Sequence, residues 1–204
     1  MIKANHHLLW ESFFDFYIAW NVKWHFRRLN IIGHWTDPVK PILVIANHFS
    51  WWDGFLVKYL NRLVLRRTFH VMMLEDQLSS RMFLTKLGAF SVKKGSRSVA
   101  ESLKYAASLF DSNQNMLLYF PQGRFYSQHT PEIAFEPGIT RLMEKIEKPF
   151  SLCFVSTLID YFEFQKPSVS IYYELRDAEI YKDIATFEQA YKDFYWKCVK
   201  SQEK

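Results

Sequence analysis

The sequence predicts an α/β fold with a largely parallel central sheet and helices on both faces. Short apolar runs alternate with longer segments of helical periodicity along most of the 204 residues. Such alternation is typical of parallel strands joined by crossover helices. The clearest strand is Ile-Leu-Val-Ile-Ala at 42–46, which is uncharged and follows Pro41, as expected of a strand buried on both faces.

The other elements follow from changes in the apolar period along the chain. We expect strands near 42–46, 69–74, 89–93, 116–120, 151–156 and 168–175. We expect helices over 6–29, 52–67, 76–87, 96–110, 138–146 and 186–200. The last strand begins by alternating small or polar residues with apolar ones, which favours an edge position. No Pro/Gly/Ser-rich linker or internal repeat divides the chain, so residues 36–204 should form a single α/β domain.

The N-terminal segment, residues 1–35, is dense in aromatic side chains and carries cations towards its end. Its tryptophans are Trp10, Trp20, Trp24 and Trp35, and its closing cations are Lys23, Arg27 and Arg28. A narrow polar stripe recurs at i+4 on an otherwise apolar helix and consists of Glu11, Asp15, Ala19 and Lys23. This pattern favours an interfacial amphipathic helix that lies on a lipid bilayer.

Two alternatives for this helix stay open. A wide apolar face also suits a helix that packs on the protein's own sheet. The aromatic residues, with a net charge of +5, would also suit stacking on single-stranded nucleic acid, but no recognition motif accompanies them, so we expect no nucleic-acid partner. The sequence contains no run of 18 or more uncharged apolar residues, so a transmembrane helix is disfavoured. We therefore expect a peripheral or monotopic protein at the cytoplasmic face of the cell membrane.

The cysteines give no sign of a disulfide framework or a metal centre. Cys153 and Cys198 sit in apolar surroundings without a C-x-x-C pattern, and the histidines are scattered without metal-ligand spacing. We therefore expect no metal site.

A histidine and an aspartate five positions apart, His48 and Asp53, follow the strand at 42–46 directly. On one continuous helix they would lie about 140° apart, because each residue turns about 100°. They can meet if His48 lies in a turn and the helix starts with Ser50 as its N-cap, which puts Asp53 at the third helical position. The same residues fit a capping box, in which Asp53 only satisfies a backbone N–H.

A second apolar strand ends in a turn that carries an arginine. Met-Leu-Leu-Tyr-Phe at 116–120 is followed by Pro121, Gln122, Gly123 and Arg124. Proline and glycine end the strand and let backbone N–H groups approach a ligand closely.

In this order, Asn-His-x4-Asp at 47–53 and Phe-Pro-Gln-Gly at 120–123 resemble the PlsC-like glycerolipid and lysophospholipid acyltransferase family, over roughly residues 40–160. The resemblance implies transfer of an acyl group from acyl-CoA or acyl carrier protein to a hydroxyl of a lysophospholipid-like or other lipid acceptor. No bound cofactor is implied. His48 would act as general base and Asp53 would orient it. The implied substrate-binding residues are Asn47, Ser50, Lys93, Lys94, Pro121, Gln122, Gly123 and Arg124.

The chain also departs from the family pattern. Lys94 stands where an arginine is frequent, Gln122 replaces a glutamate, and Arg124 follows Gly123 directly instead of following a threonine. These departures indicate an altered acceptor. Two other functions stay open: an inactive, membrane-associated lipid-binding relative, suggested by Gln122, and a thioester hydrolase in which water replaces the alcohol.

Overall fold

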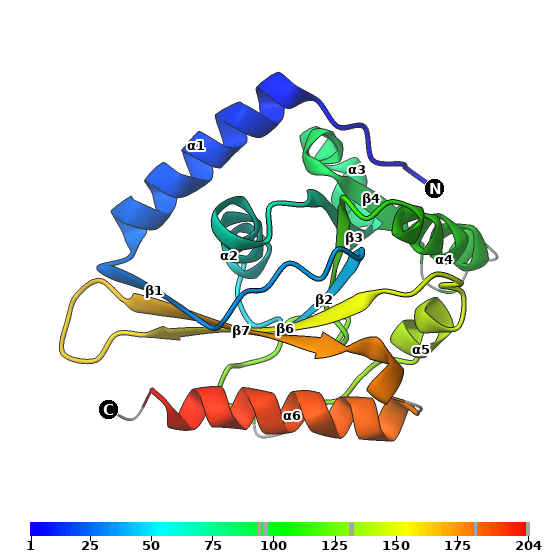
Figure 1. The fold of residues 1–204 in the computed structure, drawn as a ribbon. Helices are drawn as coiled ribbons and strands as arrows, with labels where there is room; N and C mark the ends of the chain where they lie inside the picture. Colours follow the sequence, from blue (N-terminus) through cyan, green and yellow to red (C-terminus); the bar gives the residue numbers. More distant parts are fainter. Residues whose placement is uncertain (94, 96–97, 131–132, 182, 203–204) are drawn as a thin grey trace.

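A seven-stranded mixed sheet forms the centre of the molecule in the computed structural model, which describes residues 1–93, 95, 98–130, 133–181 and 183–202. Its strand order is β1-β7-β6-β2-β5-β3-β4 (Figure 1). The strands are β1 Arg28–Ile32, β2 Ile42–Ala46, β3 Thr68–Leu74, β4 Ala89–Val92, β5 Asn115–Tyr119, β6 Ser151–Asp160 and β7 Ser168–Asp177. All neighbouring pairs are parallel except β6 and β7, which form an antiparallel hairpin. The largely parallel sheet predicted from the sequence is confirmed.

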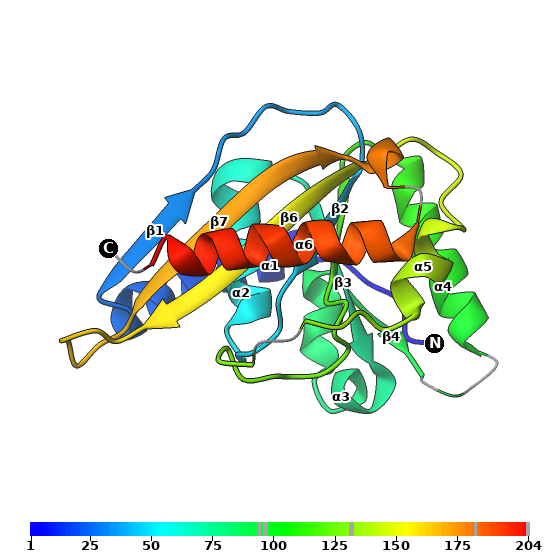
Figure 2. The same cartoon turned by 90° about the horizontal axis from the view of Figure 1, so that it is seen from below.

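Helices cover both faces of this sheet (Figures 1 and 2). They are α1 Leu8–His25, α2 Asp53–Leu60, α3 Glu75–Ser79, α4 Ser98–Ser108, α5 Gly138–Met143 and α6 Ile184–Lys200. Successive residues of β2 point to opposite faces: Ile42 and Val44 pack in one apolar cluster with α1 and α2, and Leu43 and Ile45 in another with α4, α5 and α6. Because both faces are covered, every residue of β2 is fully buried.

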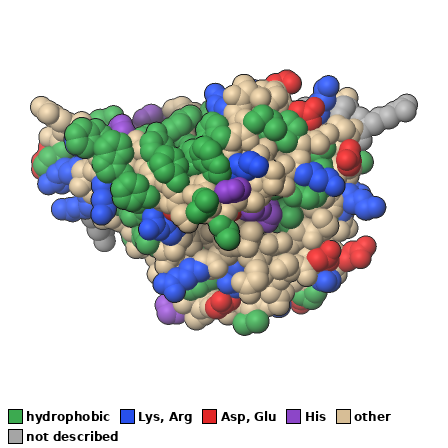
Figure 3. Space-filling model, turned by 90° about the horizontal axis from the view of Figure 1, so that it is seen from above, with side chains coloured by type: hydrophobic (Ala, Val, Ile, Leu, Met, Phe, Trp, Pro, Cys, Tyr) green, Lys and Arg blue, Asp and Glu red, His purple; other side chains and the backbone are tan. Residues whose placement is uncertain are grey.

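The N-terminal helix α1 has an inward seam and an outward aromatic face. The inward residues follow helical spacing: Glu11 bonds His6, Asp15 Oδ1 lies 3.5 Å from Nζ of Lys58 on α2, and Ile18 and Val22 are buried in the core. Exposed side chains on the helix include Leu8, Leu9, Trp10, Phe13, Phe16, Trp20 and Trp24. Figure 3 shows apolar side chains gathered over α1, with Lys and Arg beside them. No helix within the described residues has the length and apolarity that a bilayer crossing requires.

Two sequence predictions about the sheet are wrong. The run at 168–175 is not an edge strand, because β7 lies between β6 and β1. The edge strand next to β7 is β1, which begins at Arg28, whereas the N-terminal helix was expected to extend to residue 29. Leu29 and Ile31 of β1 pack against the core, and this burial with the parallel pairing to β7 favours a strand there.

Two of the predicted helices are shorter and interrupted. The segment expected to be helical over 52–67 is α2 followed by a π-helical turn, Asn61–Leu65, which ends at Arg66 with a left-handed backbone, φ 54°. The segment expected over 76–87 is α3 followed by a 3₁₀ helix, Met82–Leu87. A left-handed residue stops a helix, and Gly88 does so at the second of these, with φ 93°.

Candidate active site

His48 and Asp53 meet at the carboxyl end of the central strand β2. Nδ1 of His48 lies 3.0 Å from Oδ2 of Asp53. The Asp53 side chain is fully buried, whereas the His48 side chain is 20% exposed. A hydrogen bond to the carboxylate places the imidazole proton on Nδ1 and leaves Nε2 as the ring nitrogen available to a substrate. This geometry is compatible with the general base and orienting acid predicted from the sequence.

The Asp53 carboxylate also closes the turn between β2 and α2. Its Oδ2 accepts the backbone N–H groups of Phe49 and Ser50, both at 2.8 Å. The same carboxylate thus contacts the His48 ring, as an orienting acid would, and also accepts backbone N–H groups before the helix, as a capping residue would. The two residues meet without Ser50 as the N-cap, because α2 begins at Asp53 with Trp52 as its N-cap. Ser50 Oγ instead accepts the N–H of Trp52 at 3.1 Å within the preceding turn.

Strand β6 supplies two further contacts through Thr157, a residue that the sequence did not single out. The Thr157 hydroxyl donates to Oδ1 of Asp53 at 3.0 Å. Its backbone N–H donates to Oδ1 of Asn47, and the Asn47 amide donates back to the Thr157 carbonyl, both at 2.9 Å. Asn47 therefore joins the end of β2 to β6, and the Thr157 hydroxyl holds Oδ1 of Asp53, the carboxylate oxygen that does not face His48. The predicted strand ended at 156, one residue too early to include it.

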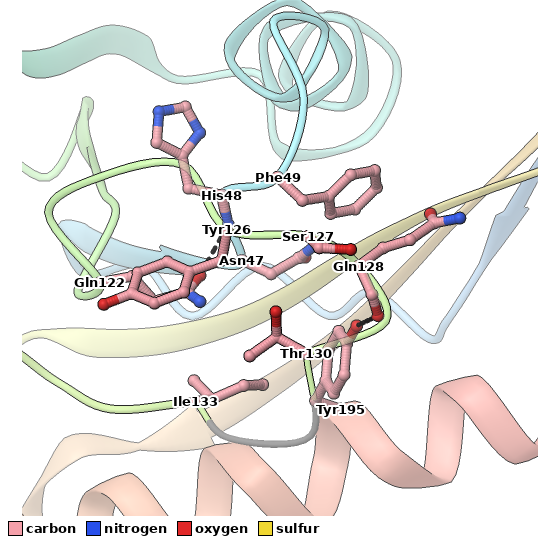
Figure 4. A pocket seen from close by; sticks show the side chains of 10 residues that line it. All are labelled: Asn47, His48, Phe49, Gln122, Tyr126, Ser127, Gln128, Thr130, Ile133 and Tyr195. Atoms are coloured by element: carbon pink, nitrogen blue, oxygen red, sulfur yellow. Dashed lines mark hydrogen bonds between the residues drawn. The ribbon is translucent and has the colours of Figure 1, made fainter.

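The turn after β5 holds the backbone of His48. Oε1 of Gln122, which is 4% exposed, accepts the His48 N–H at 2.8 Å, and the Tyr126 N–H donates to the His48 carbonyl at 3.0 Å (Figure 4). Gly123 adopts φ 65° and donates its own N–H to the Phe120 carbonyl at 3.1 Å. The Gly123 N–H is thus used within the turn, and Pro121 is buried beside it.

Two phenylalanines enclose the His48 ring. The centroid of Phe120 lies 4.0 Å from that of His48 with a 16° interplanar angle, and the centroid of Phe125 also lies at 4.0 Å, with 34°. Two rings cannot both lie this close to one face, so they cover opposite faces. Figure 4 shows the His48 ring pointing away from the small pocket below the loop, which is lined in part by Thr130, Ile133 and Tyr195.

Of the predicted cations, Arg124 contacts Tyr126. Nε of Arg124 donates to the Tyr126 hydroxyl at 2.9 Å, and its guanidinium lies 4.8 Å from the Tyr126 ring centroid. Lys93 follows β4, and two strands, β5 and β3, lie between β4 and β2. Since neighbouring strands are about 4.8 Å apart, the backbone of β4 lies about 14 Å from that of β2. Lys94 lies outside the described residues.

Comparisons with known proteins agree with this fold. The family model named Acyltransferase matches residues 28–158. The crystal structure of the 1-acyl-sn-glycerophosphate (LPA) acyltransferase, PlsC, from Thermotoga maritima superposes with a TM-score of 0.66 at 14% identity, covering 94% of this chain and 79% of that one. That likeness establishes the fold. Among curated proteins, none matches the chain. Because the family model spans more than half of the sequence, the chain belongs to the Acyltransferase family and has a PlsC-like fold.

Proposed function

We propose that the protein transfers a fatty acyl group from a thioester, acyl-CoA or acyl carrier protein, to a hydroxyl of a lipid-like acceptor. The observation that carries this proposal is the 3.0 Å contact between His48 Nδ1 and Asp53 Oδ2 at the end of β2. A buried carboxylate on one ring nitrogen and an accessible second nitrogen are what a general base needs. Membership of the Acyltransferase family supports the same reaction class.

The chemical step requires no covalent enzyme intermediate. An alcohol is a poor nucleophile at neutral pH, so Nε2 of His48 takes the hydroxyl proton while the oxygen attacks the thioester carbonyl carbon. Asp53 stabilises the imidazolium that forms, as a carboxylate does when it is hydrogen-bonded to a catalytic histidine. The C–S bond then breaks, the new C–O ester bond remains, and the imidazolium returns its proton to the departing thiolate. General-base catalysis of this kind contributes about 10² to 10⁴ in rate.

The exposed aromatic face of α1 supports association with a membrane surface, where a lipid acceptor would be found. The acidic residues Glu11 and Asp15 face His6 and Lys58 of the protein. Tryptophans at positions 10, 20 and 24 are 45–60% exposed. Tryptophan with neighbouring cations is typical of residues at the headgroup level. We infer peripheral or monotopic attachment at the cytoplasmic face.

The placement of the cations supports an acceptor other than glycerol 3-phosphate or ordinary lysophosphatidic acid. A phosphate monoester carries nearly two charges and is best held by a guanidinium fork. Arg124, however, contacts Tyr126, and Lys93 begins three strand positions from His48. We infer an acceptor that is less charged or bulkier, such as an amino-acid-containing lysolipid or a hydroxylated aromatic or isoprenoid lipid.

Product analysis tests the proposal. Purified protein is incubated with a labelled acyl thioester and a lipid extract of the native organism, and the labelled products are identified by mass spectrometry. An acylated lipid is the expected product. Labelled free fatty acid alone would identify a thioester hydrolase instead. Binding of lipid without consumption of the thioester would identify a lipid-binding relative and contradict the proposal. Efficient preference for added lysophosphatidic acid would contradict the inferred acceptor class only.

A further inference from the structure

The outer of the two rings around His48 is a large apolar surface beside the reacting nitrogen. Phe125 is 53% exposed, although its ring stacks on the imidazole with a centroid distance of 4.0 Å. Phe120 covers the opposite face of His48 and is less exposed. A half-exposed aromatic ring at a site that binds lipid retains apolar area that a ligand can bury.

The enclosure restricts how an acceptor reaches His48. Both faces of the ring are covered, and Nδ1 is bonded to Asp53. The hydroxyl must therefore approach Nε2 at the ring edge, roughly in the plane of the imidazole. Because Phe125 covers one face of the imidazole and is half exposed, we infer that the part of the acceptor next to its hydroxyl lies against the Phe125 ring.

The apolar chemistry of the Phe125 ring disfavours a doubly charged group against it. Phe125 offers no hydrogen-bond donor, and the preceding cation, Arg124, directs its Nε and the face of its guanidinium towards Tyr126. A phosphate placed against the ring would lose water without gaining a donor from Phe125, which is unfavourable. An apolar or aromatic group would instead bury the ring, and offset stacking would add to the attraction.

We propose that Phe125 forms an acceptor subsite that selects an apolar or aromatic group next to the reacting hydroxyl and disfavours a phosphate monoester there. The proposal rests on the proposed acyl transfer and names the residue that determines its specificity. Phe125 acts here on the substrate directly, in contrast to Phe120, which contacts His48 from the more enclosed side.

The test compares two acceptors that share the same sn-2 hydroxyl and acyl chain, 1-acylglycerol 3-phosphate and 1-acyl-3-O-benzylglycerol, with one acyl thioester. We expect the unchanged protein to have the higher kcat/KM for the benzyl acceptor. Phe125→Leu should lower that kcat/KM about tenfold, mainly through KM, as loss of one apolar contact does. Phe125→Arg should shift the ratio of the two kcat/KM values at least about tenfold towards the phosphate. Phe162→Leu, in the exposed β6–β7 turn, is the matched control and should leave the ratio unchanged.

The outcomes separate the subsite from the reaction itself. If Phe125 only supports the His48 ring, Phe125→Leu will lower both kcat/KM values equally, and an unchanged ratio in both variants overturns the proposal while acyl transfer stands. If Phe125→Arg does not fold, as judged by its circular dichroism and melting, the ratio in Phe125→Leu decides. Absence of transfer to either acceptor by the unchanged protein overturns the subsite, and the proposed function falls with it only if the lipid extract also yields no acylated lipid.

Discussion

The hydroxyl of Thr157 donates a 3.0 Å hydrogen bond to Oδ1 of Asp53, while Oδ2 of the same carboxylate faces His48. Thr157 lies on β6 and is fully buried. The hydroxyl therefore fixes the rotation of the Asp53 carboxylate from the side opposite to the imidazole. We expect Thr157 to act on the reaction through Asp53, as a positioning residue.

We expect Thr157→Val, which is nearly isosteric, to lower kcat about tenfold with little change in KM. A hydrogen bond to a charged group is worth about 1.5–3 kcal/mol, and only part of it should appear in the rate. Steady-state kinetics of the purified variant provide the measurement. Thr157→Ser is the matched control and should restore kcat, because it keeps the hydroxyl. Equal loss in both variants would indicate a packing role.

Gln122 should be needed as an acceptor and not as a charge. Its Oε1 accepts the buried N–H of His48, so Gln122→Leu leaves that group unpaired. We expect a loss of about 1–3 kcal/mol in the free energy of unfolding and a lower kcat. Gln122→Glu keeps an acceptor oxygen and should retain most of the stability and most of kcat. Chemical denaturation and kinetics measure the two effects, and an inactive but stable Gln122→Glu would contradict this role.

Replacement of Trp10, Trp20 and Trp24 together by Ala should weaken binding to anionic liposomes without unfolding the protein. The three rings are exposed on α1, so their loss removes apolar contact with lipid but little of the core. Flotation with liposomes measures binding. The control is Trp196→Ala on α6, which lies at the opposite face of the sheet from α1 (Figure 1). Equal flotation of the triple variant and the unchanged protein would refute the interfacial role of α1.

Stability should fall in mild acid because of His70 on β3. Burial, together with the neighbouring His6, lowers the pKa of His70 to about 4, whereas hydrogen bonding to Asn115 and the charge of Glu11 oppose this shift. The unfolded chain, with a pKa of 6.5, binds the proton first. The stabilising contribution is therefore present above pH 6.5 and is lost as the pH falls from 6.5 towards 4.

Between pH 7 and pH 5 this linkage should lower the free energy of unfolding by about 2 kcal/mol. Urea denaturation at the two pH values measures the change. His70→Gln cannot titrate and should make the dependence shallower, by the share that His70 contributes. A dependence unchanged by this substitution would assign the acid sensitivity to other groups.

The sequence predicted those parts of the fold whose signals are local. The run at 42–46 coincides with β2, because a strand buried on both faces is uniformly apolar. By contrast, β1 directly follows a helix, and its strand character depends on pairing with β7, where Asn30 meets Ser170 far along the chain. The position of β7 within the sheet was missed for the same reason.

The candidate site was predictable to a similar extent. His48 and Asp53 lie within one turn, so their spacing indicated that they could meet. Thr157 lies 104 residues from Asp53, and no local pattern predicts its contact. Stacking of Phe125 on His48 likewise depends on how the turn after β5 folds back on β2. Gln122, which suggested altered substrate binding from the sequence, accepts the His48 backbone N–H, a contact that the sequence did not predict.

The most direct measurement of the central claim is the single-turnover rate of acyl transfer by purified His48→Ala and Asp53→Asn proteins, compared with the unchanged protein. Labelled thioester and a lipid extract that supports transfer are the substrates, and circular dichroism verifies that each variant is folded. We predict that His48→Ala loses about 10² to 10⁴ in rate, and that Asp53→Asn is severely slowed because the amide no longer holds the imidazole in the same tautomer. Transfer by folded His48→Ala protein at a near-normal rate would contradict the account.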